Sequence, residues 1–349
     1  MRMLVTGATS LLGHHTVTAL LAASHEVVVL QRSPCGIDGV TEHLGSIADR
    51  EVVDQAMVGV DQVIHLAAKV DPIGEWADFE SINVNGATKV RDAAERAGVS
   101  RFVYVSSPSV AHDGSSISGA GAMPADPGRA KGFYSISKAM AEQTLLAAST
   151  TDLAVIAIRP HLVIGPGDTQ LIGRILDRAT AGRMPLIGSG LSLVDTTWVD
   201  NAADALVAAL RAGPEIAGRA FVVSNGEPRT VHELIDRITT AAGITWSPRH
   251  IPARAAVAGG ALAEGVWQRT RRDGEPPMTA FGAEQLSTAH WFDQRETISA
   301  LGWTPTVTLA EGWERLAAHL GRTRLRRTDS NHETPVQRAR EVDGENKFH

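Results

Sequence analysis

A tyrosine and a lysine stand four positions apart in the segment YSISK, at Tyr134 and Lys138. The residues from Tyr134 to Ala148 have a helical pattern, and side chains four positions apart share one face of a helix. A free phenol has a pKa near ~10, which a neighbouring ammonium lowers. The pair can therefore exchange a proton with a carbonyl or hydroxyl oxygen, although the same spacing also arises by chance on surface helices.

Two serines, Ser106 and Ser107, follow the apolar segment RFVYV, which we expect to form a strand over 101–106. In a parallel sheet, the carboxyl ends of the strands face the ligand. The Ser107 hydroxyl can then bond the same oxygen as Tyr134 and stabilise negative charge on it. Ser106 is the second candidate for this role, and a purely structural cap on the strand is the alternative for both serines.

The opening stretch MRMLVTGATSLLGHH carries a glycine loop between an apolar strand and a helix. Gly7 permits a tight turn, and Gly13 lets the helix pack closely on the strand. The helix N-terminus, which begins with Leu11 and Leu12, then faces a pyrophosphate. Ser10 stands where a second glycine is usual, but its hydroxyl and N–H can still serve phosphate oxygens. An ordinary strand-to-helix turn is the alternative interpretation.

The second strand ends in Leu30-Gln31-Arg32-Ser33, without an acidic residue. NAD sites usually place a carboxylate here on the ribose 2′-hydroxyl, whereas an arginine can pair with the 2′-phosphate of NADP. Arg32 therefore favours NADP(H) over NAD(H). The alternatives are a solvated arginine and one that stacks on the adenine.

Strands and helices alternate along the first half of the chain, which is typical of an α/β protein. The expected strands are 3–6, 25–31, 62–67, 101–106 and 153–159, and the expected helices are 12–22, 49–58, 85–97 and 134–148. We predict a Rossmann-like doubly wound parallel sheet with a smaller C-terminal substrate lobe. The NADP(H)-binding domain spans 1–165, with a segment at about 192–225 that returns to the sheet. The lobe spans 166–320, and the polar tail 321–349 is expected to be disordered.

The glycine loop TGATSLLG is similar to the TGAxGFLG loop of the extended short-chain dehydrogenases/reductases, the NAD-dependent epimerase/dehydratase family. YSISK, RPHLVIGPGD and WVDNAADA resemble further motifs, in the family's order, over residues 3 to 316. The resemblance implies that Ser107, Tyr134 and Lys138 are catalytic, and that Tyr134 and Lys138 also contact the cofactor. Besides the glycine loop and Arg32, it implies cofactor contacts from Ser46, Ile47, Leu66, Ala67, Ala68, Asn83, Ser106, Pro160, Leu162 and Val163.

The middle of the chain looks closer to the 3β-hydroxysteroid dehydrogenase-like branch of this family. Stretches such as SSPSVAHDG and GEPPMTAFGAEQLSTAHWF resemble bacterial 2-alkyl-3-oxoalkanoate reductases. That resemblance implies NADPH-dependent reduction of a 3-keto group on an α-alkylated acid. A dehydrogenase of 3β-hydroxysteroids or other bulky secondary alcohols, a nucleotide-sugar epimerase and a non-catalytic NADP(H)-sensing protein are the alternatives.

Apolar residues of the later lobe suit a hydrophobic small-molecule substrate, although such residues more often belong to the core. They are Leu171, Ile172, Ile175, Val257, Leu262, Trp267, Phe281, Trp291 and Phe292. A substrate carboxylate would require a cation or a hydrogen-bond donor, for which His161, Lys69 and Arg183 are the candidates.

Composition argues against several other classes. The formal charge of −6 gives no reason to expect nucleic acid as a partner. A single cysteine, Cys35, excludes an internal disulfide and a cysteine-built metal site, and the scattered histidines lack ligand spacing, so no metal is predicted. We expect a cytoplasmic protein without signal peptide or membrane span, and a homodimer, as is common in the family. The short apolar segment 255–267 has three alternative interpretations: a helix that associates with a membrane surface, a cover over an apolar pocket, or a buried helix.

Overall fold

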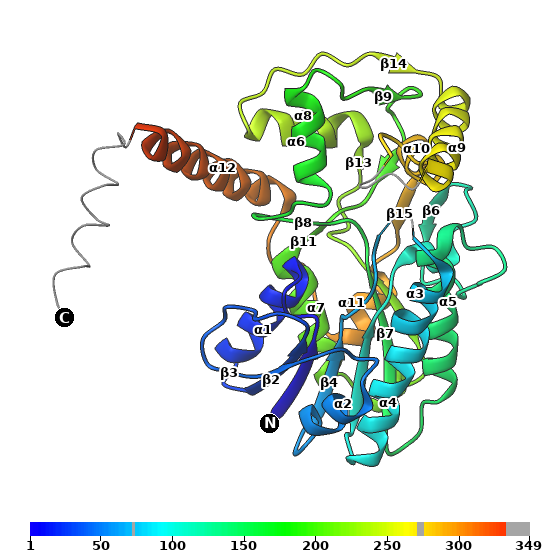
Figure 1. The fold of residues 1–349 in the computed structure, drawn as a ribbon, viewed down its shortest axis with the longest axis vertical. Helices are drawn as coiled ribbons and strands as arrows, with labels where there is room; N and C mark the ends of the chain where they lie inside the picture. Colours follow the sequence, from blue (N-terminus) through cyan, green and yellow to red (C-terminus); the bar gives the residue numbers. More distant parts are fainter. Residues whose placement is uncertain (72–73, 271–275, 333–349) are drawn as a thin grey trace.

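A seven-stranded parallel sheet is the central feature of the computed structural model, which describes residues 1–71, 74–270 and 276–332 (Figure 1). Its strands lie in the order β3-β2-β1-β4-β5-β7-β12. Their bounds are β1 Arg2–Thr6, β2 Glu26–Gln31, β3 Val40–Leu44, β4 Gln62–His65, β5 Arg101–Val105, β7 Ala154–Pro160 and β12 Ala220–Val223. The strand order reverses between β1 and β4, and ligands of such sheets bind at the carboxyl edge beside this switch point.

Burial explains why most of these segments form strands. β2 reads EVVVLQ, and its last five residues are buried. Such runs of β-branched residues suit a parallel sheet that is covered on both faces. β3 reads VTEHL and was not predicted, because its side chains are half-buried or exposed at the edge of the sheet. Its place in the sheet therefore comes from pairing with β2 rather than from burial.

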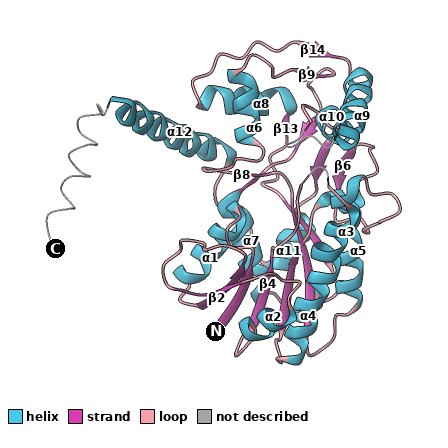
Figure 2. Cartoon of the chain, viewed as in Figure 1, coloured by secondary structure: helices cyan, strands magenta, loops and turns pink. Residues whose placement is uncertain are grey.

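Helices cover both faces of this sheet, as Figure 2 shows. The first layer consists of α1 Leu11–Ala22, α7 Val199–Arg211 and α11 Arg295–Leu301. The second consists of α2 Arg50–Ala56, α4 Ala87–Arg96 and α5 Gly132–Ala147, and two short segments, α3 Trp76–Phe79 and the π-helix η1 Glu80–Gly86, lead into α4. Each layer closes one apolar core against the sheet. The arrangement confirms the predicted doubly wound architecture.

A smaller lobe lies beyond the carboxyl ends of the strands (Figure 1). Its mixed sheet has the order β13-β10-β15-β6, with bounds β6 Ile117–Ala120, β10 Leu193–Val194, β13 Arg229–Thr230 and β15 His290–Phe292. Two small sheets pair β8 Val163–Ile164 with β11 Thr197–Trp198, and β9 Leu186–Ile187 with β14 His250–Ile251. The remaining helices are η2 Pro108–Ala111, α6 Ile172–Thr180, η3 Pro214–Ile216, α8 Val231–Ala241, α9 Ala253–Thr270, α10 Ala280–Ser287 and α12 Leu309–His332.

Helix α9 contains the segment 255–267 and lies on the surface of the lobe. Ala256 and Gly260 are buried, whereas Leu262 and Val266 are exposed. A Cβ atom at Gly260 would come within 2.5 Å of the Thr279 backbone, so α9 and the start of α10 approach closely. The interpretation of this segment as a buried helix is therefore wrong. None of the helices in the described residues is long and apolar enough to cross a membrane.

Helix α12 extends to His332, whereas the polar composition predicts disorder from residue 321 (Figure 1). Leu309 and Leu316 anchor the first part of the helix in the core of the lobe. Extension of an existing helix is easier than its nucleation, because each added residue gains one hydrogen bond. The polar residues after Leu320 therefore continue a helix that packing has already started. Residues 333–349 of the predicted tail lie outside the described residues.

Candidate active site

The glycine loop between β1 and α1 leaves little room for side chains. Gly7 has a φ of +79°, a conformation that favours glycine. A Cβ atom at Gly13 would come within 2.3 Å of the Gly7 carbonyl oxygen and 2.9 Å of Ala8 Cα. The backbone therefore packs closely at the N-terminus of α1, where helices present free N–H groups. This cradle fits the pyrophosphate of a nicotinamide dinucleotide.

Ser10 replaces the usual second glycine without backbone strain. Its φ of −74° and ψ of 157° are open to any L-residue. Its hydroxyl accepts a hydrogen bond from the Gly13 N–H at 3.1 Å and donates one to the Gly7 carbonyl at 2.9 Å. Ser10 is thus the N-cap of α1, and its hydroxyl holds the loop in shape.

The predicted contacts to the adenosine half of the cofactor follow β2 and β3. Arg32 is exposed directly after β2. Ser46 follows β3, and its Oγ accepts a hydrogen bond from the Ala48 N–H at 3.2 Å. Ile47 is buried, and a Cβ atom at Gly86 would approach its Cδ1 to 2.9 Å. Ile47 therefore packs against η1, while Arg32 and Ser46 keep partly exposed polar groups at this edge.

Two loops border the expected position of the nicotinamide. The loop of Leu66, Ala67 and Ala68 follows β4, and the Ala67 N–H donates to Thr6 Oγ1 at 3.1 Å. At the end of β7, its last residue Pro160 and the following Leu162 line a cavity, and Val163 begins β8. Leu162 has a positive φ of +40°. Such a conformation is uncommon outside glycine and persists where the surrounding structure holds the backbone, often at functional sites.

Asn83 lies buried in the π-helix η1 and connects two parts of the site. Its Oδ1 accepts a hydrogen bond from the Lys69 N–H at 2.7 Å. Its Nδ2 donates to the Lys69 carbonyl at 3.0 Å and to Ser137 Oγ at 2.9 Å. These bonds engage both donors and the oxygen of the amide. Asn83 thereby joins the loop after β4 to helix α5, which carries Tyr134 and Lys138.

Ser107 and Tyr134 line one cavity at the carboxyl edge of the sheet. The Ser107 side chain lies within hydrogen-bonding reach of the phenol of Tyr134 and lowers the pKa of that phenol. The Ser107 Oγ also lies 2.9 Å from Ser109 Oγ. Ser106 is 5% exposed and does not line the cavity, and its Oγ has no partner among the described residues. The structure therefore brings Ser107, rather than Ser106, to the phenol.

Burial raises the pKa of Tyr134 to about 12, while the hydrogen bond from Ser107 opposes this rise. The sequence predicts the opposite direction, because the ammonium of Lys138 was expected to outweigh desolvation. In the folded chain desolvation is the larger effect. The phenol is therefore protonated at neutral pH, and it can donate a hydrogen bond and then a proton to a substrate oxygen.

Lys138 is buried beneath the carboxyl end of β5. Its Nζ donates to the Val105 carbonyl at 2.6 Å and lies 4.0 Å from the centroid of the Tyr104 ring. Burial lowers the pKa of Lys138 to about 7, and the Glu142 carboxylate, one turn further along α5, opposes this shift. The charge of Lys138 at neutral pH therefore depends on Glu142.

Glu142 forms a buried ion pair with Arg159 of β7. Arg159 Nε donates to Glu142 Oε2 at 2.9 Å, and Arg159 Nη2 donates to Glu142 Oε1. Arg159 Nη1 donates to the Met123 carbonyl at 2.7 Å. This bidentate contact fixes α5, with Tyr134 and Lys138, against β7.

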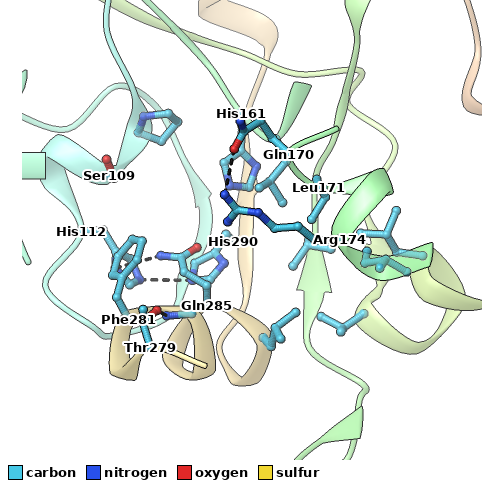
Figure 3. Close-up of a pocket in the computed structure, with 18 of the residues that line it drawn as sticks. Ser109, His112, His161, Gln170, Leu171, Arg174, Thr279, Phe281, Gln285 and His290 are labelled. Carbon is cyan, nitrogen blue, oxygen red and sulfur yellow. Dashed lines mark hydrogen bonds between the residues drawn. The ribbon is translucent and has the colours of Figure 1, made fainter. Parts of the chain in front are cut away.

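The cavity beside Ser107 and Tyr134 has a volume of about 340 Å³. Most of its walls are apolar and consist of Ile117, Leu162, Leu171, Ile175, Met184, Val194, Val231, Leu234, Ile235, Met278, Phe281, Leu286 and Phe292. Arg174 and Arg178 of α6 also line it, and none of the described residues in the lining is acidic. Figure 3 shows Arg174 extending into the cavity, where its Nη2 donates to Gln170 Oε1 at 2.9 Å.

Three histidines from distant parts of the sequence, His112, His161 and His290, meet in this cavity (Figure 3). The Nε2 atoms of His112 and His290 are 3.1 Å apart, and Gln285 Nε2 is 3.3 Å from His112 Nδ1. The ring centroids of His161 and His290 are 6.1 Å apart. Burial lowers the pKa of His112, of His161 to about 4 and of His290 to about 3. These imidazoles are therefore neutral at pH 7, and the positive charge of the lining comes from its arginines.

The substrate-binding candidates that the sequence suggests fall into two groups in the structure. Those that line the cavity are Leu171, Ile175, Phe281, Phe292 and His161. Those outside its lining are Ile172, Val257, Leu262, Trp267, Trp291, Lys69 and Arg183. Ile172 belongs to the core of the lobe, Lys69 Nζ lies 2.7 Å from Asp71 Oδ2, and Arg183 is exposed.

Sequence reasoning found His161 but missed other polar residues that line the cavity, which are Gln170, Arg174, Arg178, Ser109, His112, Gln285 and His290. His112 and His290 stand within SSPSVAHDG and GEPPMTAFGAEQLSTAHWF, two of the stretches that carry the family resemblance. These two histidines were the sequence signal from which the polar wall of the cavity could have been predicted. Arg174 and Arg178 carried only the spacing of a helix face.

The model of the NAD dependent epimerase/dehydratase family matches residues 3–224. The chain belongs to this family. It is 39% identical to the 2-alkyl-3-oxoalkanoate reductase of Stenotrophomonas maltophilia (strain K279a), over 91% of this chain and 99% of that protein. It is 36% identical to the 2-alkyl-3-oxoalkanoate reductase of Shewanella oneidensis, over 90% of this chain and 85% of that protein. These matches confirm the predicted membership among the extended short-chain dehydrogenases/reductases, which use a nicotinamide cofactor, and identify the chain as an oxidoreductase.

A solved structure supports the same assignment. MoeE5 in complex with UDP-glucuronic acid and NAD is 25% identical and has a TM-score of 0.70. The match covers 93% of this chain and 100% of that chain, so it includes both the sheet and the lobe. The cradle of Gly7 and Gly13 therefore lies in a fold that holds NAD in a relative.

Proposed function

We propose that the protein reduces the 3-keto group of a 2-alkyl-3-oxoalkanoic acid to a hydroxyl group, with NADPH as the cofactor. The apolar cavity of about 340 Å³ beside Ser107 and Tyr134 supports this substrate class most strongly. Its walls suit alkyl chains better than a sugar, whose hydroxyls need polar partners. The two relatives at 36% and 39% identity are named for this reaction.

Ser107 and Tyr134 act on the oxygen of the ketone. Their hydroxyls donate hydrogen bonds to that oxygen and stabilise the negative charge that develops on it. Because Tyr134 is protonated at neutral pH, it can also give its proton to the oxygen. After the proton transfer, Tyr134 is a phenolate. Lys138 lies one turn along the same helix, and its charged ammonium form favours this phenolate. A bound nicotinamide supplies the hydride.

The preference for NADPH follows from the end of β2. Arg32 is exposed there, directly after the strand. A guanidinium matches the geometry of a phosphate and can pair with it through two parallel hydrogen bonds. We propose that Arg32 binds the 2′-phosphate and thereby selects NADPH over NADH.

Replacement of Tyr134 by phenylalanine tests the proposed proton donor. Tyr134→Phe keeps the ring and removes the acid, so we expect turnover to fall by about 10²- to 10⁴-fold. NADPH affinity is expected to be retained, which a fluorescence titration checks. Turnover is followed by the absorbance of NADPH with a 2-alkyl-3-hydroxyalkanoic acid as substrate.

The other tyrosine of the chain provides a matched control. Tyr104→Phe removes a hydroxyl that has no partner among the described residues and keeps the ring beneath Lys138. We expect this variant to retain turnover. Undiminished turnover in Tyr134→Phe would contradict the role given to Tyr134.

A further inference from the structure

Helix α9 presents a continuous apolar stripe to solvent. The stripe occupies positions i, i+4, i+7 and i+11 of one helix face, and its exposed members are Ala255, Gly259, Leu262 and Val266. Leu262 is 71% exposed and Val266 is 38% exposed. A Cβ atom at Gly259 would meet nothing within 4 Å, so this face has no neighbour at that point. Contiguous apolar surface of this kind is typical of an interaction site.

The charges at the two ends of the stripe are positive. Arg254 stands beside its first residue, Arg269 continues the same line at i+14, and both are exposed. The single acidic residue in the sequence of α9, Glu264, is directed towards α10, where its Oε1 accepts a hydrogen bond from the Ala280 N–H at 3.0 Å. Arginines beside an apolar helix face complement anionic lipid headgroups above a hydrocarbon layer, because their stems lie along apolar surface while the guanidinium reaches a phosphate.

The opposite face of α9 packs behind the substrate cavity. Ala256 and Val257 belong to one apolar cluster with Met278 and Leu286, and the last two residues line the cavity. Figure 1 shows α9 at the outer edge of the lobe, beside α10. The helix therefore covers the cavity with one face and leaves the apolar stripe on the other face open to solvent.

We propose that α9 docks the protein on an anionic membrane surface, with the stripe in the interface between headgroups and acyl chains. The proposed reduction explains the use of such docking, because a substrate with two alkyl chains dissolves in lipid and α9 places the cavity beside it. The docking surface itself rests on the residues of α9. A second copy of the chain is a poorer occupant, because a symmetric contact along the stripe would bring Arg254 and Arg269 against the same two arginines.

Sedimentation with vesicles of phosphatidylcholine, with and without phosphatidylglycerol, tests the proposal. We expect the wild type to bind the vesicles that contain phosphatidylglycerol and to be released by salt, which screens the arginines. Leu262→Glu should lower the partition coefficient by about 10- to 100-fold or more, since burial of a leucine side chain is worth that much. Arg254→Gln/Arg269→Gln should lower it by about tenfold on the anionic vesicles alone.

Val58→Glu is the matched control for Leu262→Glu. Val58 is 68% exposed and lies between α2 and the start of β4, at the edge of the sheet that faces away from the lobe. The substitution adds the same charge at nearly the same exposure, and we expect it to leave vesicle binding unchanged. The thermal midpoint and the NADPH affinity of each variant show whether it has folded.

Absence of wild-type binding to the anionic vesicles would overturn the proposal, and so would full binding by folded Leu262→Glu. Light scattering without vesicles examines self-association. A dimer that Leu262→Glu dissociates, without vesicle binding by the wild type, would overturn the proposal in favour of a second copy. Turnover is measured separately. If the protein binds vesicles through α9 but forms no NADPH from a 2-alkyl-3-hydroxyalkanoic acid, the proposed reduction fails while the docking surface stands.

Discussion

Replacing Glu142 by glutamine tests the buried ion pair behind the active-site helix. The side chains of Glu142 and Arg159 are 1% and 2% exposed, and two N–O contacts join them. Glutamine preserves the shape but leaves the guanidinium buried without its counter-charge. Breaking a buried pair from one side costs about 3–5 kcal/mol, and we expect Glu142→Gln to lower the free energy of unfolding by that amount.

The same substitution acts on Lys138. Burial lowers the pKa of Lys138 and the Glu142 carboxylate opposes this shift, and the two effects together leave the pKa at about 7. Without that carboxylate the pKa falls further, so the ammonium is lost at a lower pH. If charged Lys138 assists turnover, the alkaline limb of the pH profile of kcat shifts towards lower pH in Glu142→Gln.

Urea unfolding followed by tryptophan fluorescence measures the change in stability. Glu95→Gln is the control, because Glu95 forms an exposed i,i+4 pair with Arg91 at 2.9 Å, and it should cost less than about 0.5 kcal/mol. The double variant Glu142→Leu/Arg159→Met removes both charges and should lose less stability than Glu142→Gln alone. A loss in Glu142→Gln as small as that in Glu95→Gln would refute the reasoning.

Three further predictions concern the loop, the cofactor and pH. Gly13→Ala places a Cβ atom 2.3 Å from the Gly7 carbonyl oxygen. This substitution should weaken NADPH binding by about tenfold or more in a fluorescence titration. The control Gly259→Ala adds a Cβ atom that meets nothing within 4 Å, and it should leave NADPH binding unchanged. Arg32→Ala should lower the kcat/KM preference for NADPH over NADH by about tenfold, and an unchanged ratio would exclude the 2′-phosphate contact. Burial raises the pKa of Asp195 from 3.8 to about 6, so between these values the folded state keeps a proton that the unfolded state releases. Stability should therefore fall by about 3 kcal/mol as pH rises through this window, and urea midpoints of Asp195→Asn should lack that fall.

The central sheet could be predicted because its strands carry their own signal. The VVVL run of β2 is buried on both faces, and such a run predicts a covered parallel strand wherever it lies. β3 and the two-residue strands β10 and β13 carry no such run. Their pairing depends on partners that the rest of the fold brings to them, so local patterns cannot predict it.

The candidate active site likewise has features that local sequence patterns predict and features that depend on the fold. Gly7, Gly13 and the spacing of Tyr134 and Lys138 are local patterns, and the sequence could point to them. The direction of the pKa shift of Tyr134 depends on how deeply the fold buries the phenol. The polar wall depends on contacts between distant residues, such as His112 and His290, which are 178 positions apart in the sequence and meet in one cavity.

The most direct test of the proposed reduction is the absorbance of reduced nicotinamide, recorded with purified protein, NADP⁺ and a 2-alkyl-3-hydroxyalkanoic acid. The hydroxy acid is used because free β-keto acids decarboxylate, and a 3β-hydroxysteroid is run in parallel. We predict formation of NADPH with the hydroxy acid alone. NADPH formation with the steroid alone, or with neither alcohol although NADP⁺ binds, would contradict the proposed reaction.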